Sequence, residues 1–123
     1  MREIKFRAWC LDYKVMDNDF YIKSSGVVYE SANRTYDTPN IEIEENPNLI
    51  VMQFTGLQDK NGVDIYEGDI ISIDYIGSNS NSKYPPKQVK WDDVKCGFNI
   101  SFGIECKVIG NIYQNPELIN NNL

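Results

Sequence analysis

The residues with the clearest chemical potential are four acidic side chains in one short central stretch of the sequence. They are Asp59, Asp64, Glu67 and Asp69. Carboxylate oxygens bind Mg²⁺ and Ca²⁺, and a metal-dependent enzyme such as a nuclease would need such a cluster together with a positioned base. The spacing does not match an EF-hand loop, since Val63 and Ile70 stand where that loop requires oxygen ligands. Aspartates also begin tight turns by accepting backbone hydrogen bonds, so the sequence favours turn roles over a metal site, and we expect no cofactor.

A second pattern interleaves lysines with aromatic rings. It comprises Lys83, Tyr84, Lys87, Lys90, Trp91 and Lys95. Nucleic-acid bases stack on aromatic rings while lysines contact phosphates, so this strip is a candidate for binding single-stranded nucleic acid. The residues expected to make those contacts are Lys87, Lys90, Trp91 and Lys95. Two observations count against this hypothesis. Val89 and Trp91 share strand parity, which favours a core position for Trp91, and Asp92 and Asp93 dilute the positive charge.

A third pattern is the aromatic-rich N-terminal part of the chain. Its rings belong to Trp9, Tyr13, Tyr21, Tyr29 and Tyr36. Because Trp and Tyr are enriched in protein interfaces, we take Trp9, Tyr13 and Tyr21 as candidates for contacting a protein partner or a second copy of the chain. The alternative is that Trp9 belongs to a second apolar face that the barrel covers.

Composition removes several classes of function. The chain of 123 residues has no histidine, which is the commonest general base and a common ligand of transition metals. Its three cysteines contain no CxxC pair, so neither a zinc site nor a disulfide framework is predicted. The net charge of −6 argues against non-specific binding to duplex DNA. No apolar run is long enough to span a bilayer, and the first residues lack the apolar region of a signal peptide, so we expect a soluble protein with no membrane partner.

Residue types and periodicity predict a mainly β protein. β-branched and aromatic residues greatly outnumber alanine and leucine. Apolar and polar residues alternate over 4–9, 69–76 and 98–104, and the segment 49–54 is apolar on both faces, as in a central strand. Two further strands are expected near 87–91 and 106–113. Only the end of the chain is helical in pattern, because Asn115 can cap a helix of about one turn that begins at Pro116.

Turn signals divide the chain further. The run Asp59-Lys60-Asn61-Gly62 contains an Asn-Gly pair, which predicts a hairpin because both residues tolerate positive φ. Gly68 marks a second tight turn, residues 77–86 form a polar loop, and residues 31–48 form a long excursion with one short strand. These signals predict an N-terminal β extension over 1–48 and a small β-barrel over 49–123, folded together as one cooperative unit.

The ordered motifs of the chain resemble one family. They are Met1-Arg2-Glu3-Ile4-Lys5-Phe6-Arg7-Ala8-Trp9, Met52-Gln53-Phe54-Thr55-Gly56-Leu57, Asp59-Lys60-Asn61-Gly62, Ile65-Tyr66-Glu67-Gly68-Asp69-Ile70, Val108-Ile109-Gly110-Asn111-Ile112-Tyr113 and Asn115-Pro116-Glu117-Leu118. This set is similar to the YopX family of phage and prophage proteins. The resemblance implies an SH3-like barrel in the C-terminal half with added N-terminal structure, and it carries over no activity and no site residues. The chain departs from the family at Cys10, where Asp commonly follows the opening Trp.

The leading hypothesis from the sequence is therefore a non-enzymatic phage or prophage accessory protein. It would be a β-barrel module that binds a host or phage protein in the host bacterial cytoplasm. Two alternatives stay open: a nucleic-acid-binding module that uses the lysine–tryptophan strip, and a metal-dependent enzyme that uses the 59–69 carboxylates. Self-association through an exposed strand edge is a further expectation.

Overall fold

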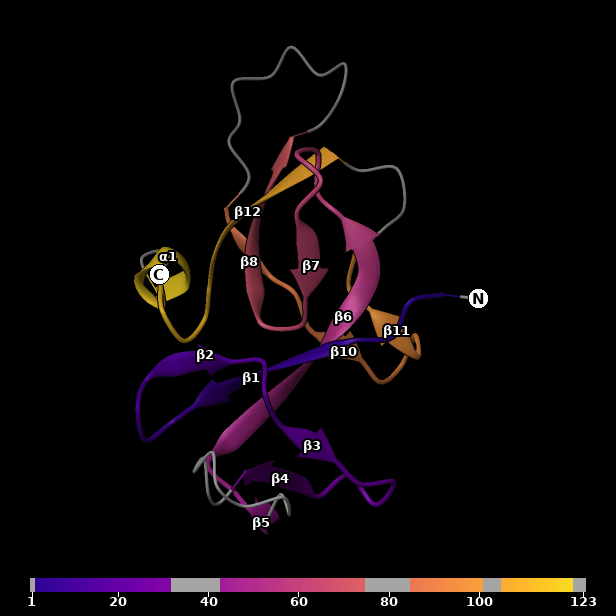
Figure 1. Cartoon of the computed structure of the whole chain (residues 1–123). Coiled ribbons are helices and arrows are strands. Elements are labelled where there is room, and N and C mark those ends of the chain that lie inside the picture. Colours follow the sequence, from indigo (N-terminus) through magenta and orange to yellow (C-terminus); the bar gives the residue numbers. More distant parts are fainter. Residues whose placement is uncertain (1, 32–42, 75–84, 101–104, 121–123) are drawn as a thin grey trace. The chain divides into compact units, whose positions relative to one another are not determined.

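The protein is mainly β, as the sequence predicts, and its described residues contain one short helix, near the C-terminus (Figure 1). The computed structural model describes residues 2–31, 43–74, 85–100 and 105–120. The chain divides into two compact units. One consists of Phe6–Met52, and the other joins Met1–Lys5 to Gln53–Leu123. The long strand β6 (Leu49–Gln58) contributes its first residues to one unit and the rest to the other.

The Phe6–Met52 unit is built from short antiparallel strands. Strand β1 (Phe6–Cys10) pairs with β2 (Val15–Asp17) on one side and is followed in the sheet order by β6 on the other. A second sheet has the order β3 (Tyr21–Ile22), β4 (Val28–Ser31), β5 (Ile43–Glu45). The β4–β5 pair accounts for the short strand expected in the 31–48 excursion, whose residues 32–42 lie outside the described part.

The larger unit holds the remaining strands, which curl into a partial barrel (Figure 1). Strand β7 (Asp64–Tyr66) pairs with the second part of β6. A three-stranded sheet follows, in the order β12 (Glu105–Asn111), β8 (Asp69–Asp74), β9 (Lys87–Gln88). Strands β10 (Trp91–Asp92) and β11 (Gly97–Phe98) form a separate hairpin, and helix α1 (Glu117–Asn120) ends the described chain.

Each unit has its own hydrophobic core. In the larger unit the buried residues are Ile65, Ile71, Val89 and Cys106, with Leu57, Ile73, Ile100 and Val108 packed against them. In the other unit they are Ala8, Cys10 and Leu49, with Phe20, Val28 and Val51 packed against them. Most of these side chains are β-branched or aromatic, so the composition that predicts strands also supplies the cores those strands enclose.

The Asn-Gly hairpin forms where it is predicted, but with a different turn. The N–H of Gly62 donates to the carbonyl of Asp59 at 3.0 Å, and Gly62 has a φ of 79°. Asn61 is not among the described residues with positive φ, so the connection is a type I turn followed by a left-handed glycine, rather than a type I′ turn. The physical reason is Asp59, whose carboxylate accepts the N–H groups of Asn61 and Val63 and thereby stabilises the type I geometry.

Two other predictions are corrected by the structure. The strand expected at 87–91 is broken into β9 and β10, which belong to different sheets. The helix forms at the expected place, yet the N–H of Leu118 donates to the backbone carbonyl of Asn115 at 3.2 Å, while the side-chain Oδ1 of Asn115 accepts the N–H of Asn111 at 3.3 Å. The predicted strand 98–104 is observed only as far as Phe98, and residues 101–104 lie outside the described part.

In the part of the chain that the structure describes, no helix is long and apolar enough to cross a membrane.

Candidate functional site

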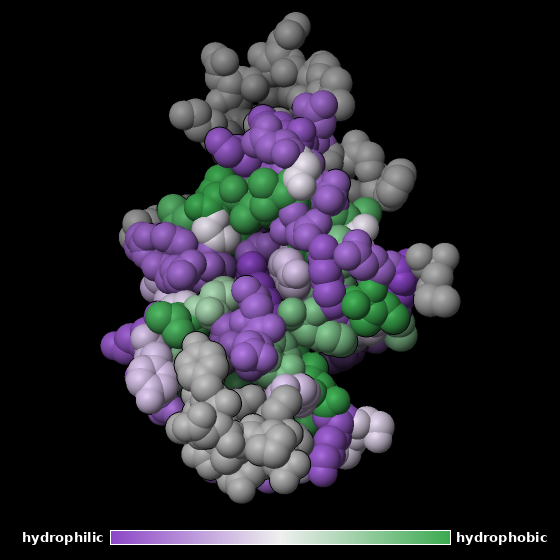
Figure 2. Space-filling view, in the orientation of Figure 1, coloured by the Kyte–Doolittle hydropathy of each residue, from purple (hydrophilic) through white to green (hydrophobic). Residues whose placement is uncertain are grey.

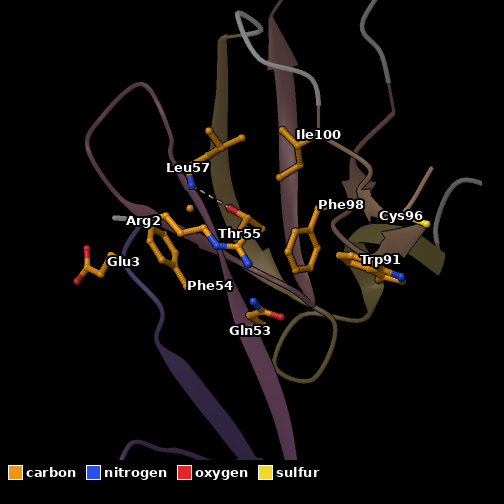
Figure 3. A pocket seen from close by; sticks show the side chains of 12 residues that line it. Arg2, Glu3, Gln53, Phe54, Thr55, Leu57, Trp91, Cys96, Phe98 and Ile100 are labelled. Atoms are coloured by element: carbon orange, nitrogen blue, oxygen red, sulfur yellow. Dashed lines mark hydrogen bonds between the residues drawn. The ribbon is translucent and has the colours of Figure 1, made fainter. Parts of the chain in front are cut away.

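A pocket of about 450 Å³ opens in the larger unit between three segments (Figure 3). Strand β6 forms one wall, the β10–β11 hairpin forms another, and the N-terminal residues reach the same space. The lining residues are Arg2, Glu3, Gln53, Phe54, Thr55, Gly56, Leu57, Trp91, Cys96, Gly97, Phe98 and Ile100. This volume lies within the range of small-ligand and side-chain binding pockets, roughly 300–1,000 Å³.

The β6 wall is shaped by a bulge. Phe54 pairs with Tyr66 and Gln58 pairs with Asp64, so β6 has two more residues than β7 between these two pairs. Gly56 stands in this bulge with a φ of 89°, a left-handed conformation that glycine adopts without strain. Bulges bend a strand and redirect its side chains, and here the bulged run supplies much of the pocket wall.

The hydroxyl of Thr55 holds the bulge together. Its Oγ1 donates to the carbonyl of Ile65 at 2.7 Å and accepts the N–H of Leu57 at 3.2 Å (Figure 3). These two bonds replace ladder bonds that the extra residues interrupt. The Thr55 hydroxyl is therefore a structural group of the wall, and the polar group that β6 leaves for a ligand is the side-chain amide of Gln53.

The opposite wall is an aromatic pair on the β10–β11 hairpin. Trp91 and Phe98 are cross-strand partners whose ring centroids lie 5.3 Å apart in an edge-to-face arrangement. The parity of Trp91 with the buried Val89 predicts a core position, but Trp91 is 47% exposed and is not a core residue. The parity argument is wrong because the chain leaves the β9 sheet before it enters β10, and the alternation is interrupted between them. In the space-filling view, apolar side chains gather over this hairpin within a largely hydrophilic surface (Figure 2).

The third side of the pocket is the N-terminal segment, which Lys5 attaches to β6. The Lys5 carbonyl accepts the N–H of Phe54 at 2.9 Å, and its ammonium lies 4.5 Å from the centre of the Phe54 ring. The same ammonium forms ion pairs with Asp64 and, at 3.3 Å, with Glu3. The hydrogen bond to Asp64 raises the pKa of Lys5, and that bond likewise lowers the pKa of Asp64. This attachment brings Arg2 to the pocket.

The four central acids have structural partners. Asp59 accepts three backbone N–H groups, including that of Val108 at 2.9 Å, and Asp69 accepts the N–H of Tyr66 at 2.8 Å. Asp64 is bound to Lys5 and Gln58, and Glu67 accepts the N–H of Gln53 at 3.5 Å. Among the described residues, no three acidic or thiol side chains lie close enough to hold a metal ion together. The four carboxylates lie close together in the sequence, but each of them stabilises a different turn or strand through its own partners.

The lysine–tryptophan strip does not form one strand face. Lys87 belongs to β9, whereas Lys90 directly precedes β10 and Lys95 lies in the β10–β11 turn. The N–H of Asn99 donates to the Lys90 carbonyl, which extends the hairpin ladder to this residue. Because side chains alternate along a ladder, Lys90 and Trp91 point to opposite faces of the hairpin. Lys83 and Tyr84 lie outside the described residues.

The N-terminal aromatic candidates differ in exposure. Trp9 is 6% exposed and is therefore buried, in agreement with the alternative that its face is covered. Tyr13 is 81% exposed and Tyr21 is 41% exposed, so both can contact a partner. Tyr29 belongs to β4, where its ring lies under the ammonium of Lys23 at 4.6 Å.

Sequence reasoning singled out Trp91 but missed most of the pocket. Arg2, Gln53 and Phe98 are far apart in the sequence, and no spacing pattern connects them. The available signal was the motif Met52-Gln53-Phe54-Thr55-Gly56-Leu57, five of whose six residues line the pocket. A glycine within a run of strand-forming residues indicates a bulge, and bulges are common beside binding sites.

Comparison with known proteins places the chain in a family. A family model described as YopX protein matches residues 5–120. The chain is also similar to a solved structure, the crystal structure of protein EF1440 from Enterococcus faecalis, with 27% sequence identity and a TM-score of 0.63. That similarity covers 97% of this chain and 99% of the other. No curated protein matches the chain. The family match confirms what the sequence motifs predict, and the chain belongs to the YopX protein family.

Proposed function

We propose that this YopX family member is a phage or prophage accessory protein that acts as a non-enzymatic protein-binding module in the host bacterial cytoplasm. The observation that carries the proposal is the pocket between β6 and the β10–β11 hairpin, with the half-exposed Trp91 at its edge. Large aromatic side chains set in a concave surface are the usual anchors of protein recognition. The phage origin and the host cytoplasm are part of the proposal, and the family resemblance supports them.

The lining of the pocket suits a peptide segment. Its apolar part consists of Phe54, Leu57, Phe98 and Ile100 together with Trp91, which can receive one side chain of a partner. Its polar part, which includes Arg2 and Gln53, can bond the backbone or a neighbouring side chain. The central carboxylates are committed to turns and to Lys5, which favours a binding role over acid–base chemistry for this unit.

The test is a selection of random dodecapeptides displayed on a carrier against the full protein. Its matched control is Trp91→Ala, with Tyr13→Ala as a second control that removes an exposed aromatic ring from the other unit. We expect peptides that enrich on the wild type and on Tyr13→Ala but not on Trp91→Ala, which circular dichroism must show to be folded. Equal enrichment of peptides on Trp91→Ala and on the wild type, or no enrichment on either, would refute the proposal.

A chemical footprint gives an independent readout of pocket occupancy. Cys96 is the exposed cysteine of the three and lines the pocket, whereas Cys10 and Cys106 are buried. A bound peptide should therefore slow alkylation of Cys96 by iodoacetamide, measured by mass spectrometry of the intact chain. A selected peptide that leaves the rate unchanged is bound elsewhere, which also counts against the pocket.

Binding of single-stranded nucleic acid is the second candidate, and one observation favours it. Trp91 is exposed, and its hairpin also carries the exposed lysines Lys90 and Lys95. Aromatic stacking with lysine contacts predicts binding that weakens steeply with salt. Fluorescence anisotropy of a labelled oligothymidine at low and moderate salt measures it. Loss of binding in Lys90→Gln/Lys95→Gln would support this candidate, and no binding at low salt would eliminate it.

A further inference from the structure

We infer that the pocket selects an acidic peptide segment, in which a carboxylate pairs with Arg2 beside an apolar side chain packed on Trp91 and Phe98. This inference rests on the proposed peptide-binding function and adds the chemistry of the partner.

The guanidinium of Arg2 is the charged group directed into the pocket. In the close-up its side chain runs past Phe54, and its nitrogen atoms lie toward the centre, near Thr55 and Gln53 (Figure 3). The carboxylates of Glu3 and Asp64 are both paired with Lys5, and no carboxylate among the described residues lies within ion-pair distance of Arg2. Arginine presents a planar fork of donors that matches a carboxylate, and this fork faces the space a ligand would fill.

The other charged residue of the lining, Glu3, does not cancel Arg2 at that point. Its carboxylate is bound by the ammonium of Lys5 at 3.3 Å, and in the close-up it points away from the pocket (Figure 3). The hairpin contributes no excess of either sign, since Lys90 and Lys95 are matched in number by Asp92 and Asp93. The centre of the pocket therefore favours a negative group, although the whole chain carries −6.

The surroundings of Arg2 decide which negative group fits. The aromatic pair and the aliphatic side chains of Leu57 and Ile100 provide an apolar surface next to one cation. A phosphate backbone needs several cations in a row, and Lys90 points to the hairpin face opposite Trp91. One carboxylate next to one apolar side chain is the pattern that a single arginine and an aromatic wall can satisfy together. The geometry thus points to an aspartate or glutamate within about two residues of an apolar or aromatic residue in the partner.

The experiment repeats the dodecapeptide selection with a charge reversal. The protein is used at full length with its purification tag at the carboxyl end, so that Arg2 keeps its surroundings. The variants are Arg2→Glu and, as a control for overall charge, Lys14→Glu, which makes the same change at an exposed residue of the other unit. We expect acid-rich peptides from the wild type and from Lys14→Glu, and a loss of the acidic preference, or a change to basic peptides, from Arg2→Glu.

A double-mutant cycle with one selected peptide then measures the interaction between the peptide's acid and Arg2 directly. Replacing its acid by the amide should weaken binding to the wild type about tenfold, as expected for a hydrogen-bonded charge pair, and should leave binding to Arg2→Gln almost unchanged. Equal weakening of both proteins would show that the acid does not contact Arg2 and would overturn the inference. The measurement is isothermal titration calorimetry with the peptide and its amide analogue.

The outcomes separate this inference from the proposed function. Peptides that depend on Trp91 but show no acidic preference would overturn the inference and leave the peptide-binding function standing. A failure of all peptides to enrich over Trp91→Ala would overturn both. Salt-sensitive binding of oligothymidine that requires Trp91, with no peptide enrichment, would assign the pocket to nucleic acid instead.

Discussion

Replacing Asp59 by alanine tests how far one side chain holds the larger unit together. The carboxylate is buried, at 7% exposure, and accepts N–H groups from Asn61 at 2.8 Å, Val63 at 2.9 Å and Val108 at 2.9 Å. The first two bonds close the hairpin turn. The third crosses to β12, where the hairpin also donates from the N–H of Lys60 to the carbonyl of Cys106 at 3.0 Å.

The loss of stability in Asp59→Ala depends on whether each of the three N–H donors can find another acceptor. A hydrogen bond to a charged acceptor contributes roughly 1.5–3 kcal/mol. Asn61 and Val63 are exposed, so their N–H groups can turn to water, whereas the N–H of Val108 lies in a partly buried strand and loses its partner. We therefore expect Asp59→Ala to lower the free energy of unfolding by about 2–4 kcal/mol, which corresponds to a fall in Tm of roughly 10 °C for a chain of this size.

A matched control isolates the bond to β12. Asp92 Oδ1 also accepts two turn N–H groups, those of Val94 at 2.9 Å and Lys95 at 3.2 Å, but its turn is exposed and, among the described residues, its carboxylate makes no hydrogen bond to another strand. Asp92→Ala should cost less than about 1 kcal/mol in urea denaturation followed by circular dichroism. Equal losses for Asp59→Ala and Asp92→Ala would refute the claim that the bond to Val108 dominates.

The pH dependence of stability provides a second check on Asp59. Burial by itself would raise the pKa of this carboxyl, but the N–H donors of Val108, Val63 and Asn61 outweigh it and hold the pKa below its ordinary value. A lowered folded-state pKa gives stability that is present above the unfolded-state value of about 3.9 and is lost as the pH falls through the folded-state value. Asp59→Asn should therefore flatten the loss of stability below about pH 4, and an unchanged slope would contradict this reasoning.

Three further outcomes are expected. Gly110→Ala should lower stability by about 1–3 kcal/mol in urea denaturation, because a Cβ there would stand 2.5 Å from Asn115 Oδ1, and Asn115→Gly should relieve part of the loss. Lys5→Ala should raise the pKa of Asp64 toward its ordinary value in a carboxyl-detected NMR titration, and an unchanged pKa would show that the ion pair is absent in solution. Ellman's reagent should label Cys96 rapidly in the native protein and the two buried thiols only on unfolding, so three equal rates would contradict the core assignment.

Local patterns predicted much of the fold. The alternation over 69–76 corresponds to β8 as far as Asp74, the doubly apolar run at 49–54 corresponds to a strand inside the sheet order β2-β1-β6-β7, and Gly68 has the positive φ that its turn requires. These features depend on neighbours within a few residues, which is the range that periodicity and turn chemistry report.

The candidate site was less predictable because it is assembled over long distances in the sequence. Whether Trp91 is exposed depends on where the chain leaves one sheet and enters another, and strand parity cannot report such a break. Arg2 reaches the pocket only because Lys5 is bound to Asp64 and Phe54, which lie some fifty residues or more away in the chain. The turn at Asn61 differs from the prediction for a local reason, because the carboxylate of Asp59, two residues earlier, determines the turn type and the Asn-Gly pair does not.

The direct hydrogen bond between the Lys5 carbonyl and the Phe54 N–H has a topological consequence. Residues 6–52 are an insertion in the larger unit, and Lys5 and Phe54, on either side of it, are bonded to each other. The bond therefore ties the start of the chain to the second half of β6, whatever the length of the segment between them.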